Sequence, residues 1–557
     1  MSDTQDTPDA LLAAIDLGSN SFHLMIAKSD FGELRPVQAL AEKVQLGETS
    51  STAMLTPGAI DRGLACLERF KQLIDSTAPA KLRIVGTNAL RRAKNRQDFI
   101  EPAEQILGAP IDVIYGREEA RLIYLGVAHT LSDDEDTRLV VDIGGGSTEF
   151  ILGERFEPLR LESLQMGCVS YGEAFFPDGK ITKERFDAAY HRARIEVSHI
   201  RRNYHSGSWK EAVGSSGTLR AIETLITTEG HREEGIDRAA LGELKKQLLT
   251  FSHIDEINLE GLSESRKSVV TAGLAITMGI FDGLQIPLMR TSTGALREGV
   301  IYDLIGRFSH EDVRTRTISA MQQRYSVDQT IADLVTHRVA LLAEATREAW
   351  QLEPSDIELL EWAGALHEIG VAVSQKNYSQ HSAYLVLNTD LPGFAEQDQA
   401  IMAALIAGLR GKVRSEMLDP ISKRKRQTVA RMMVLLRLAV ILKHVEALEA
   451  LPDLSVSAEE ETLTLAFPEQ WGADHPLTIW EIEQSTPAME RLGVSVVLNA
   501  GYRSSVLQVV TTLVVENNIK TRRFIFLIHP HRHDGIHGTQ QNPAHNRGVS
   551  KGRGDTG

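Results

Sequence analysis

A short phrase occurs twice in the chain, and it constrains the fold more than any other feature. Residues 14–27 read AIDLGSNSFHLMIA, and residues 140–153 read VVDIGGGSTEFILG. Each copy has an apolar strand that ends in an Asp, a Gly/Ser turn, and then a second apolar strand. A phrase repeated at this spacing predicts a duplicated α/β fold with a cleft between the halves. An Asp beside such a turn is suited to holding a metal and a phosphate together.

Charge and composition exclude several classes of protein. The 557 residues are too many for one core, and the net charge of −15 is not that of a general nucleic-acid binder. Two cysteines, Cys66 and Cys168, exclude a disulfide framework and are typical of a reducing cytoplasm. The acidic N-terminus does not resemble a signal peptide, and no apolar run approaches the length of a membrane span. We expect a cytoplasmic protein without stable membrane insertion, and peripheral membrane association stays open.

Strand and helix patterns predict five segments. Residues 11–135 and 136–308 each read as three strands followed by alternating helices and strands, which indicates two related α/β domains. Residues 309–445 are rich in long helices, and residues 446–498 read as a small α+β unit. Residues 499–557 end in a stretch rich in His, Gly and Asn, and we expect them to be partly disordered.

The two Gly/Ser turns are the main candidates for a phosphate-binding site. Glycines let backbone N–H groups point to one place and approach a phosphate closely, and Ser and Thr hydroxyls add donors. Either turn alone could be a tight turn with a hydrogen-bonded Asp. Two turns at equivalent places in duplicated halves favour a clamp. The Gly-rich turns at 213–222 and 292–302 lead into helices and could bind anions or simply cap those helices.

A basic run and an acidic pair lie between the two copies. The run could equally be a solvated helix face, and it comprises Arg91, Arg92, Lys94 and Arg96. The pair, Glu118 and Glu119, lies where a helix is predicted to begin, a position that favours carboxylates electrostatically. The residues by themselves therefore do not identify a general base.

Seven segments, in order, carry a resemblance to a known family. They read DLGSNSFH, VGTNALR, GREEARLIYLGV, DIGGGSTE, MGCVS, GSSGT and GALREGVIY. Together they resemble the Ppx/GppA family, exopolyphosphatases and guanosine pentaphosphate phosphohydrolases of the actin/hexokinase/Hsp70-like superfamily. The resemblance runs from about residue 12 to about residue 495. It implies two duplicated ribonuclease H-like α/β domains, then an all-α HD-like domain and a small C-terminal α+β unit.

The resemblance also implies roles for individual residues. It places the catalytic base at Glu119, and it assigns Asp142 and Glu149 to the metal and to the attacking water. Asp16, at the equivalent strand end, is a further candidate metal ligand. Mg²⁺ is the implied cofactor, and a homodimer through the C-terminal region is the implied assembly. The candidate phosphate contacts are Ser19, Asn20, Ser21, Arg91, Gly144, Gly145, Gly146, Ser147 and Thr148.

The expected function is removal of terminal phosphate from inorganic polyphosphate. The alternative is hydrolysis of guanosine pentaphosphate, because both substrates present the same terminal phosphoanhydride. A kinase of the same superfamily and a sensing module that binds without turnover are the two rivals. A cationic track for a long chain could be formed by Lys412, Arg414 and residues 423–426, which could also be a solvated loop.

Two details refine these expectations. The pair His367–Glu368, with His337 and His381, resembles part of an HD-type metal site. Glu in place of Asp and an incomplete ligand set favour structural histidines. The repeated phrase is also asymmetric, because the first copy has His23 where the second has Glu149. We expect the second turn to serve metal and water and the first to grip phosphate.

Overall fold

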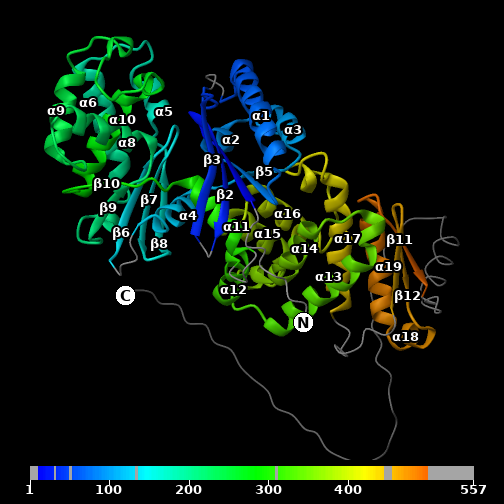
Figure 1. Cartoon of the computed structure of the whole chain (residues 1–557). Coiled ribbons are helices and arrows are strands. Elements are labelled where there is room, and N and C mark those ends of the chain that lie inside the picture. The colour runs from blue at the N-terminus through cyan, green and yellow to red at the C-terminus, as the bar shows by residue number, and fades with distance from the viewer. Residues whose placement is uncertain are drawn as a thin grey trace, which may run out of the picture. The chain divides into compact units, whose positions relative to one another are not determined.

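Each copy of the repeated phrase forms two adjacent strands in the computed structural model (Figure 1). The first copy supplies β1 (Leu11–Leu17) and β2 (Ser21–Asp30), and the second supplies β6 (Arg138–Ile143) and β7 (Thr148–Glu154). The structure describes residues 11–30, 33–48, 53–131, 136–307, 312–443 and 454–499. Apart from Asn499, the predicted tail at 499–557 therefore lies outside the described residues.

The two sheets that contain these strands have the same topology. The other strands are β3 (Glu33–Lys43), β4 (Lys81–Gly86), β5 (Ile111–Val113), β8 (Glu157–Leu164), β9 (Glu211–Gly214) and β10 (Arg290–Thr291). The orders β3-β2-β1-β4-β5 and β8-β7-β6-β9-β10 correspond strand by strand. β1 pairs antiparallel with β2 and parallel with β4. In the same way, β6 pairs antiparallel with β7 and parallel with β9. The predicted duplicated α/β fold is confirmed.

The strand register is also the same in the two copies. Asp16 on β1 pairs with His23 on β2, and Asp142 on β6 pairs with Glu149 on β7. His23 therefore occupies in the first sheet the place that Glu149 occupies in the second, as the sequence alignment of the two phrases predicts. Because directly opposed side chains of a pair lie close together, each Asp has a titratable neighbour across the strand.

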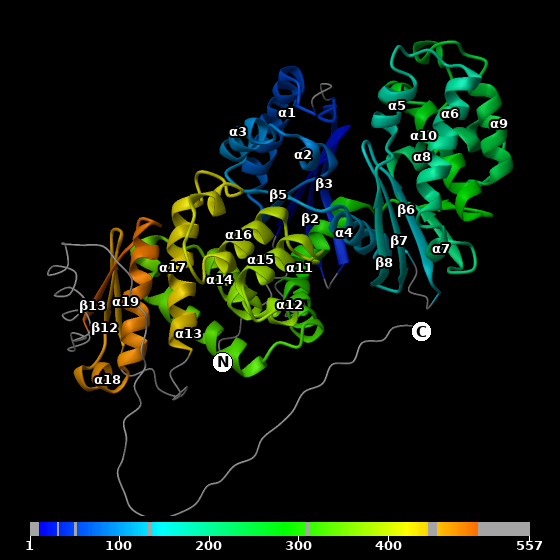
Figure 2. The same cartoon turned by 180° about the vertical axis from the view of Figure 1, so that it is seen from behind.

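Helices cover each sheet and form its core. The first sheet packs with α1 (Pro57–Thr77), α2 (Asn88–Arg92) and α3 (Gln97–Leu107), and Phe22 meets Phe99 across this core at 6.0 Å between ring centroids. Figure 2 shows the helices beside the second sheet. They are α5 (Cys168–Phe175), α6 (Lys183–Ser198), α7 (Arg201–Tyr204), α8 (Gly217–Thr228), α9 (Arg238–Leu248) and α10 (Glu264–Leu284).

Two further helices cross at glycines. α4 (Gly116–Ala128) and α11 (Leu296–Gly306) each begin shortly after the fifth strand of their own sheet. A Cβ atom at Gly126 would lie 2.1 Å from the Ala295 carbonyl oxygen, and one at Gly299 would lie 1.7 Å from that of Leu122. Only glycine allows this backbone contact. The crossing packs the first turn of α11 against the second half of α4.

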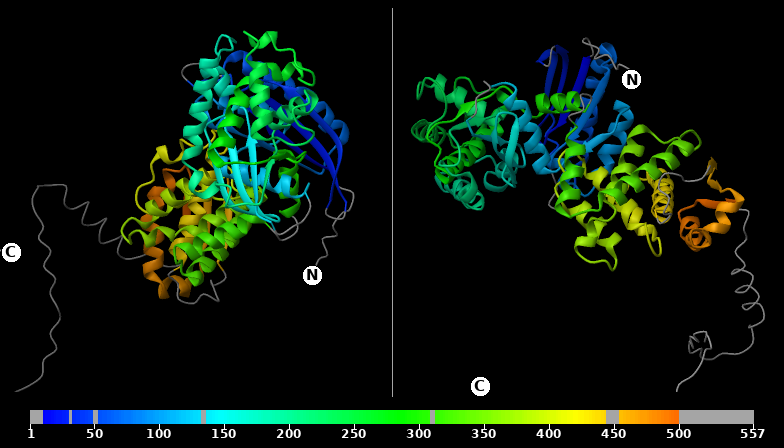
Figure 3. Two further views of the ribbon diagram at one scale, coloured as in Figure 1. Left: turned by 90° about the vertical axis from the view of Figure 1, so that its left-hand side faces the viewer. Right: turned by 90° about the horizontal axis from the view of Figure 1, so that it is seen from below.

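The region from Val313 to Asn499 is mainly helical and ends in a small sheet (Figure 3). Its helices are α12 (Val313–Arg324), α13 (Gln329–Trp350), α14 (Pro354–Leu366), α15 (Tyr378–Asn388), α16 (Glu396–Ala407) and α17 (Arg426–Leu442). The sheet contains β11 (Ser455–Glu459), β12 (Thr462–Ala466) and β13 (Ser495–Asn499), with α18 (Glu469–Asp474) and α19 (Pro476–Glu490) between the last two. Helices and sheet share one hydrophobic core. The predicted boundary at 445 stays a prediction.

One helix among the described residues has the length and apolar composition of a membrane span. It is α10, and 83% of its apolar stretch is buried inside the structure. The expectation that no run approaches this length is therefore corrected. The burial of α10 in the core of the second sheet explains its composition, because a core helix is apolar on most of its faces.

Candidate active site

A polar cavity of about 130 Å³ lies between the two Gly/Ser turns. Its volume is below that of typical ligand pockets, so it suits a phosphate group better than a whole nucleotide. A larger hollow of about 360 Å³, beside β8, contains none of the predicted site residues. Predicted site residues that line the polar cavity are Asp16, Ser19, Asn20, Ser21, Glu119, Asp142, Gly144, Gly145, Gly146 and Ser147.

The two turns lie in direct contact. A Cβ atom at Gly145 would lie 2.9 Å from Ser19 Cβ and 3.2 Å from the Asn20 backbone nitrogen. One at Gly146 would lie 2.2 Å from the Asn88 side-chain oxygen. The glycines are therefore required by close packing of the halves, as well as by any approach of a phosphate. The facing arrangement that the repeat suggests is present.

Hydrogen bonds fix the second turn and show which way Thr148 faces. The Gly144 N–H donates to the Ser147 carbonyl at 2.9 Å, and the Cys168 N–H donates to the Gly144 carbonyl at 2.9 Å. The buried Thr148 hydroxyl donates to the Met166 carbonyl, and Thr148 does not line the cavity. Its hydroxyl therefore stabilises the turn, whereas the predicted phosphate contacts at 144–147 lie on the cavity wall.

Buried carboxylates dominate one side of the site. Burial, and then the neighbouring Glu119, raise the pKa of Asp16 to about 8. Burial raises the pKa of Asp142 to about 6, although Ser215 donates a hydrogen bond to its carboxylate. Glu149 is behind the cavity wall, where burial and the nearby Glu119 and Asp142 raise its pKa. These groups repel one another, so the site favours a cation or a proton.

Metal binding can be tested against the atoms that lack partners. Asp16 Oδ1 and Glu149 Oε2 are buried without a hydrogen bond. Among the residues that the structure describes, no group of three or more His, Cys, Asp or Glu is arranged to hold a metal ion. Mg²⁺ usually takes only one or two carboxylates and completes its shell with water and phosphate oxygens. The donor chemistry therefore fits Mg²⁺, and the assignment of Asp16, Asp142 and Glu149 as ligands stays a prediction.

Glu119 is held in the first turn of α4. Its backbone N–H donates to the Tyr115 carbonyl at 2.9 Å, and its carboxylate accepts from Arg91 Nη1 at 2.8 Å. The same Arg91 nitrogen donates to the Ile114 carbonyl at 2.7 Å. Arg91 thus orients Glu119 from outside the cavity lining, and its Nη2 is buried without a partner. Direct contact of Arg91 with phosphate stays a prediction.

Three arginines that are not among the predicted site residues line the cavity: Arg220 on α8, Arg266 on α10 and Arg297 on α11. Arg220 has a sequence signal, because VGSSGTLR at 213–220 matches VGTNALR at 85–91 with one insertion. A Cβ atom at Gly86 would lie 2.6 Å from Leu90 Cδ1, and one at Gly214 would lie 2.8 Å from Leu219 Cδ1. The two segments are therefore structurally equivalent, and they place Arg91 and Arg220 at corresponding positions.

His23 partners one of these arginines. Arg297 Nη1 lies 2.7 Å from His23 Nδ1. Burial, and then the positive charges of Arg297, Arg266 and Arg220, lower the pKa of His23 to about 3. A neutral ring can accept the hydrogen bond from the guanidinium. The first copy of the phrase thus has the neutral His23 ring where the second copy has the Glu149 carboxylate. Because a neutral ring does not cancel the charge of Arg297, that charge stays available for an anion.

Comparison with known proteins identifies the family. A sequence model of the Ppx/GppA phosphatase family matches residues 25–308, and a model of domain III of these phosphatases matches residues 313–486. The chain belongs to the Ppx/GppA phosphatase family. It is accordingly a hydrolase that acts on phosphoanhydride bonds, as the sequence resemblance predicts.

Two curated relatives of this Ppx/GppA protein have the same name. A guanosine-5'-triphosphate,3'-diphosphate pyrophosphatase of Photobacterium profundum is 38% identical over 489 residues, which cover 88% of this chain and 98% of the relative. One from Aliivibrio fischeri is 38% identical over 499 residues, 89% of this chain and 99% of the relative. Among solved structures, an Aquifex aeolicus family member is 27% identical, with a TM-score of 0.47, over 54% of this chain and 100% of that chain. The names of the two curated relatives agree with the alternative substrate better than with polyphosphate.

The HD-like pair of this Ppx/GppA chain lies among basic groups. His367 is fully buried, its Nδ1 lies 2.6 Å from the Gly364 carbonyl, and Lys443 forms an ion pair with Glu368. Burial and the Lys443 charge lower the pKa of His367 to about 4. The Glu368 carboxylate is thus already paired with an ammonium group. This arrangement agrees with the preference for structural histidines.

The four residues of the basic run at 423–426 have different surroundings. Lys425 forms ion pairs with Glu353 at 2.9 Å and Asp356 at 3.0 Å, and Arg426 donates to the Ile421 carbonyl at 3.1 Å. Lys423 and Arg424 are exposed. Within the described part of the chain, these two residues are therefore the ones of the four that could contact a long anionic substrate without breaking such an ion pair or hydrogen bond.

Proposed function

We propose that this protein hydrolyses the terminal phosphoanhydride of guanosine 5'-triphosphate 3'-diphosphate in the cavity between the two Gly/Ser turns. The observation that carries the proposal is the convergence on one cavity of Glu119, Asp142, both turns and three arginines. Relatives matched over nearly their whole length bear the name of this activity. The cavity size agrees with a terminal phosphate as the part of the substrate that is enclosed.

The chain's own groups provide charge neutralisation and positioning. Phosphoryl transfer depends mainly on these two effects. Arg220, Arg266 and Arg297 would neutralise the phosphate oxygens, and backbone N–H groups of the turns would donate to them. Asp16 and Asp142, with Glu149 behind them, would hold a Mg²⁺ ion, which supplies positive charge at the reacting phosphate when bound.

Glu119 is the proposed general base. Its carboxylate lines the cavity, and Arg91 holds one of its oxygens, so the other can accept a proton from a water molecule aligned with the terminal phosphate. An Arg–carboxylate contact of this kind also fixes the rotamer of the side chain. The water proton would thus move to Glu119 while the water oxygen attacks the terminal phosphorus. The bond from that phosphorus to the bridging oxygen would break, and the shortened nucleotide would leave with that oxygen.

The test is phosphate release by the full chain with Mg²⁺, measured in parallel on the guanosine substrate and on long-chain polyphosphate. We expect a higher kcat/KM on the guanosine substrate. Glu119→Gln should lower kcat about 10²- to 10⁴-fold, the range for loss of a general base, with an unchanged circular dichroism spectrum. Near-normal turnover by that variant would remove Glu119 from this role, and binding without turnover by the wild type would favour a sensing module.

Polyphosphate is the second candidate substrate. It presents the same terminal group to the cavity, and Lys423 and Arg424 are exposed cations that could attract a long anionic chain. A higher kcat/KM on polyphosphate in the same assay would reverse the proposed preference and leave the hydrolytic site unchanged.

A further inference from the structure

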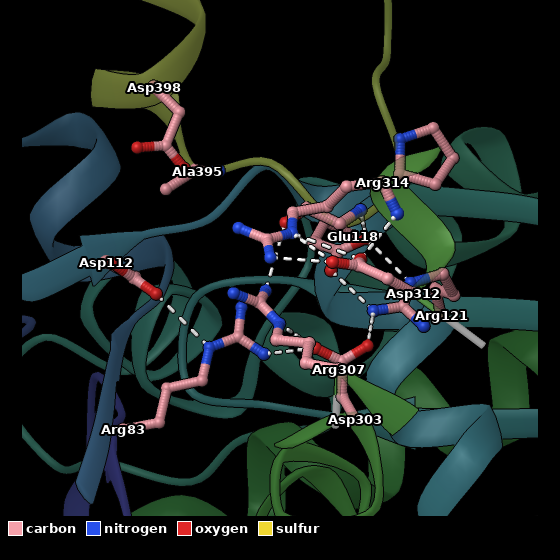
Figure 4. A network of polar contacts seen from close by, with 12 residues as sticks. Arg83, Asp112, Glu118, Arg121, Asp303, Arg307, Asp312, Arg314, Ala395 and Asp398 are labelled. Carbon is pink, nitrogen blue, oxygen red and sulfur yellow. Dashed lines mark hydrogen bonds and ion pairs between the residues drawn. The ribbon is translucent and has the colours of Figure 1, made fainter. Parts of the chain in front are cut away.

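A buried network of charged side chains surrounds Glu118, the residue before the proposed base (Figure 4). Both oxygens of its carboxylate accept from Arg121, with Nε–Oε2 and Nη2–Oε1 distances of 2.8 Å. Arg121 also binds Asp303 on α11, which in turn accepts from Arg83 Nη1 at 2.6 Å. The Glu118, Arg121 and Asp303 side chains are each less than 10% exposed. The network therefore joins α4, α11 and the first sheet.

The network extends to the helical region through one glycine. The Gly393 N–H donates to Glu118 Oε2 at 2.9 Å, and its carbonyl accepts from Arg307 Nη2 at 3.1 Å. Gly393 has a φ of +89°, and a Cβ atom there would lie 2.6 Å from Val313 Cγ1 and 2.8 Å from Arg314 Cγ. Glycine is thus required both by conformation and by space. The loop before α16 can therefore contact the first turn of α4 only with a glycine at position 393.

Glu118 and Glu119 face different surroundings from the same helical turn. Consecutive helical residues differ by about 100° in direction, which accounts for Glu119 lining the cavity while Glu118 binds the network. Any rotation of the first turn that loosens Glu118 therefore moves Glu119 as well. Displacements of about 1 Å at a catalytic group can cost about 10² in rate.

We propose that Glu118 is a positioning residue, and that its contact with Gly393 lets the helical region set the orientation of Glu119. This inference rests on the proposed function, because it takes Glu119 as the general base. Desolvation makes a buried ionic network a weak source of stability, whereas fixing one arrangement of packed elements is its best-supported use. The network's position, one residue from the base, agrees with that use.

The first experiment compares Glu118→Gln with Glu396→Gln. Glu396 on α16 binds Arg96 at 2.6 Å, so the control removes another ionic contact between the same two regions, away from α4. Glu118→Gln should lower kcat about tenfold with KM within twofold of wild type, because a displaced base impairs turnover and leaves the phosphate contacts intact. The control should change neither constant by more than twofold. Assays are run below the unfolding temperature of every variant.

Gly393→Ala gives an independent approach from the helical side. It should reproduce the loss of kcat, and the double variant with Glu118→Gln should lose little more than the stronger single one, because both act through one contact. Full additivity, or a Glu118→Gln enzyme that unfolds at a lower temperature with wild-type kcat, would overturn the inference.

Hydrogen exchange separates this inference from the proposed function. If the wild type shows no phosphate release, the proposed function fails, and the amides of residues 117–121 still report the contact. Their exchange should become faster in Glu118→Gln and in Gly393→Ala but not in Glu396→Gln. Unchanged exchange in the first two variants would show that the contact does not hold the first turn of α4.

Discussion

At the scale of single residues, Arg220, Arg266 and Arg297 meet at one cavity, where Arg220 and Arg297 repel each other. Arg220 has a lowered pKa, caused by burial and then by the nearby Arg297. Arg297 Nε is buried without a hydrogen bond. Such mutual repulsion among cations costs stability in the absence of an anion, and it is relieved when phosphate binds.

Arg297→Ala should therefore impair catalysis without destabilising the free protein. We expect kcat/KM to fall about 10²-fold, the usual loss when one charge-stabilising donor is removed. The unfolding temperature of the substrate-free protein should change little, because the relieved repulsion with Arg220 offsets the lost attraction to Asp16 and Asp142. Steady-state kinetics and thermal unfolding measure the two effects. An unaltered kcat/KM would mean that Arg297 does not contact substrate.

We expect the buried His367 to make the free energy of unfolding depend on pH. Burial and the Lys443 charge depress the pKa of its folded form from 6.5 to about 4, so its contribution is present above about pH 6.5 and lost as pH falls toward 4. This shift contributes at most about 3 to 4 kcal/mol to the free energy of unfolding, at about 1.4 kcal/mol per pKa unit. His367→Asn, which keeps a donor toward Gly364, should lose less stability between pH 7 and pH 4.5 than the wild type does. Urea unfolding at several pH values tests this, and parallel curves would contradict it.

At the scale of elements, the site depends on close approaches that glycine permits. The two turns touch at Gly145, and α4 crosses α11 at Gly126 and Gly299. The repeated phrase made the first contact predictable, because both turns have a local sequence pattern. The helix crossing had no such signal, since a glycine in a helix shows neither its partner nor its distance from it.

Gly145→Ala should separate the turns. The new methyl group would lie 2.9 Å from Ser19 Cβ, which forces the two halves of the site apart. We expect at least a tenfold loss of kcat/KM, because a shift of about 1 Å at a catalytic site can cost far more than that. Gly144→Ala is the matched control, because its Cβ would meet only the Ser147 carbonyl, at 3.1 Å. Equal losses in both variants would show that the contact between the turns is not the cause.

At the scale of the whole molecule, the acidic chain presents a few exposed cations in its helical region. Arg424 also acts on the α/β half, because its charge opposes the burial that raises the pKa of Glu104. Attraction of a long polyanion to such cations depends on chain length, whereas hydrolysis in the cavity does not. The predicted homodimer stays a prediction.

Replacing Lys423 and Arg424 by Ala should lower kcat/KM for long-chain polyphosphate more than for the guanosine substrate. Lys425→Ala is the control, because it breaks the ion pairs with Glu353 and Asp356 and should lower the unfolding temperature without substrate preference. The measurement is kcat/KM on both substrates, with thermal unfolding for each variant. Equal losses on both substrates in the double variant would show that this pair of residues does not guide the chain.

The sequence by itself determined the duplicated sheets, the two facing turns and the placement of Asp16, Asp142 and Glu119. Strand periodicity, glycine turns and helix starts are local properties, so a chain reports them residue by residue. Tertiary structure alone decided that Arg220, Arg266 and Arg297 meet at one cavity and that Thr148 turns away from it. It also placed Glu118 against Gly393, 275 residues away. Such contacts depend on how helices pack at their crossings, and no periodic pattern in the sequence records that.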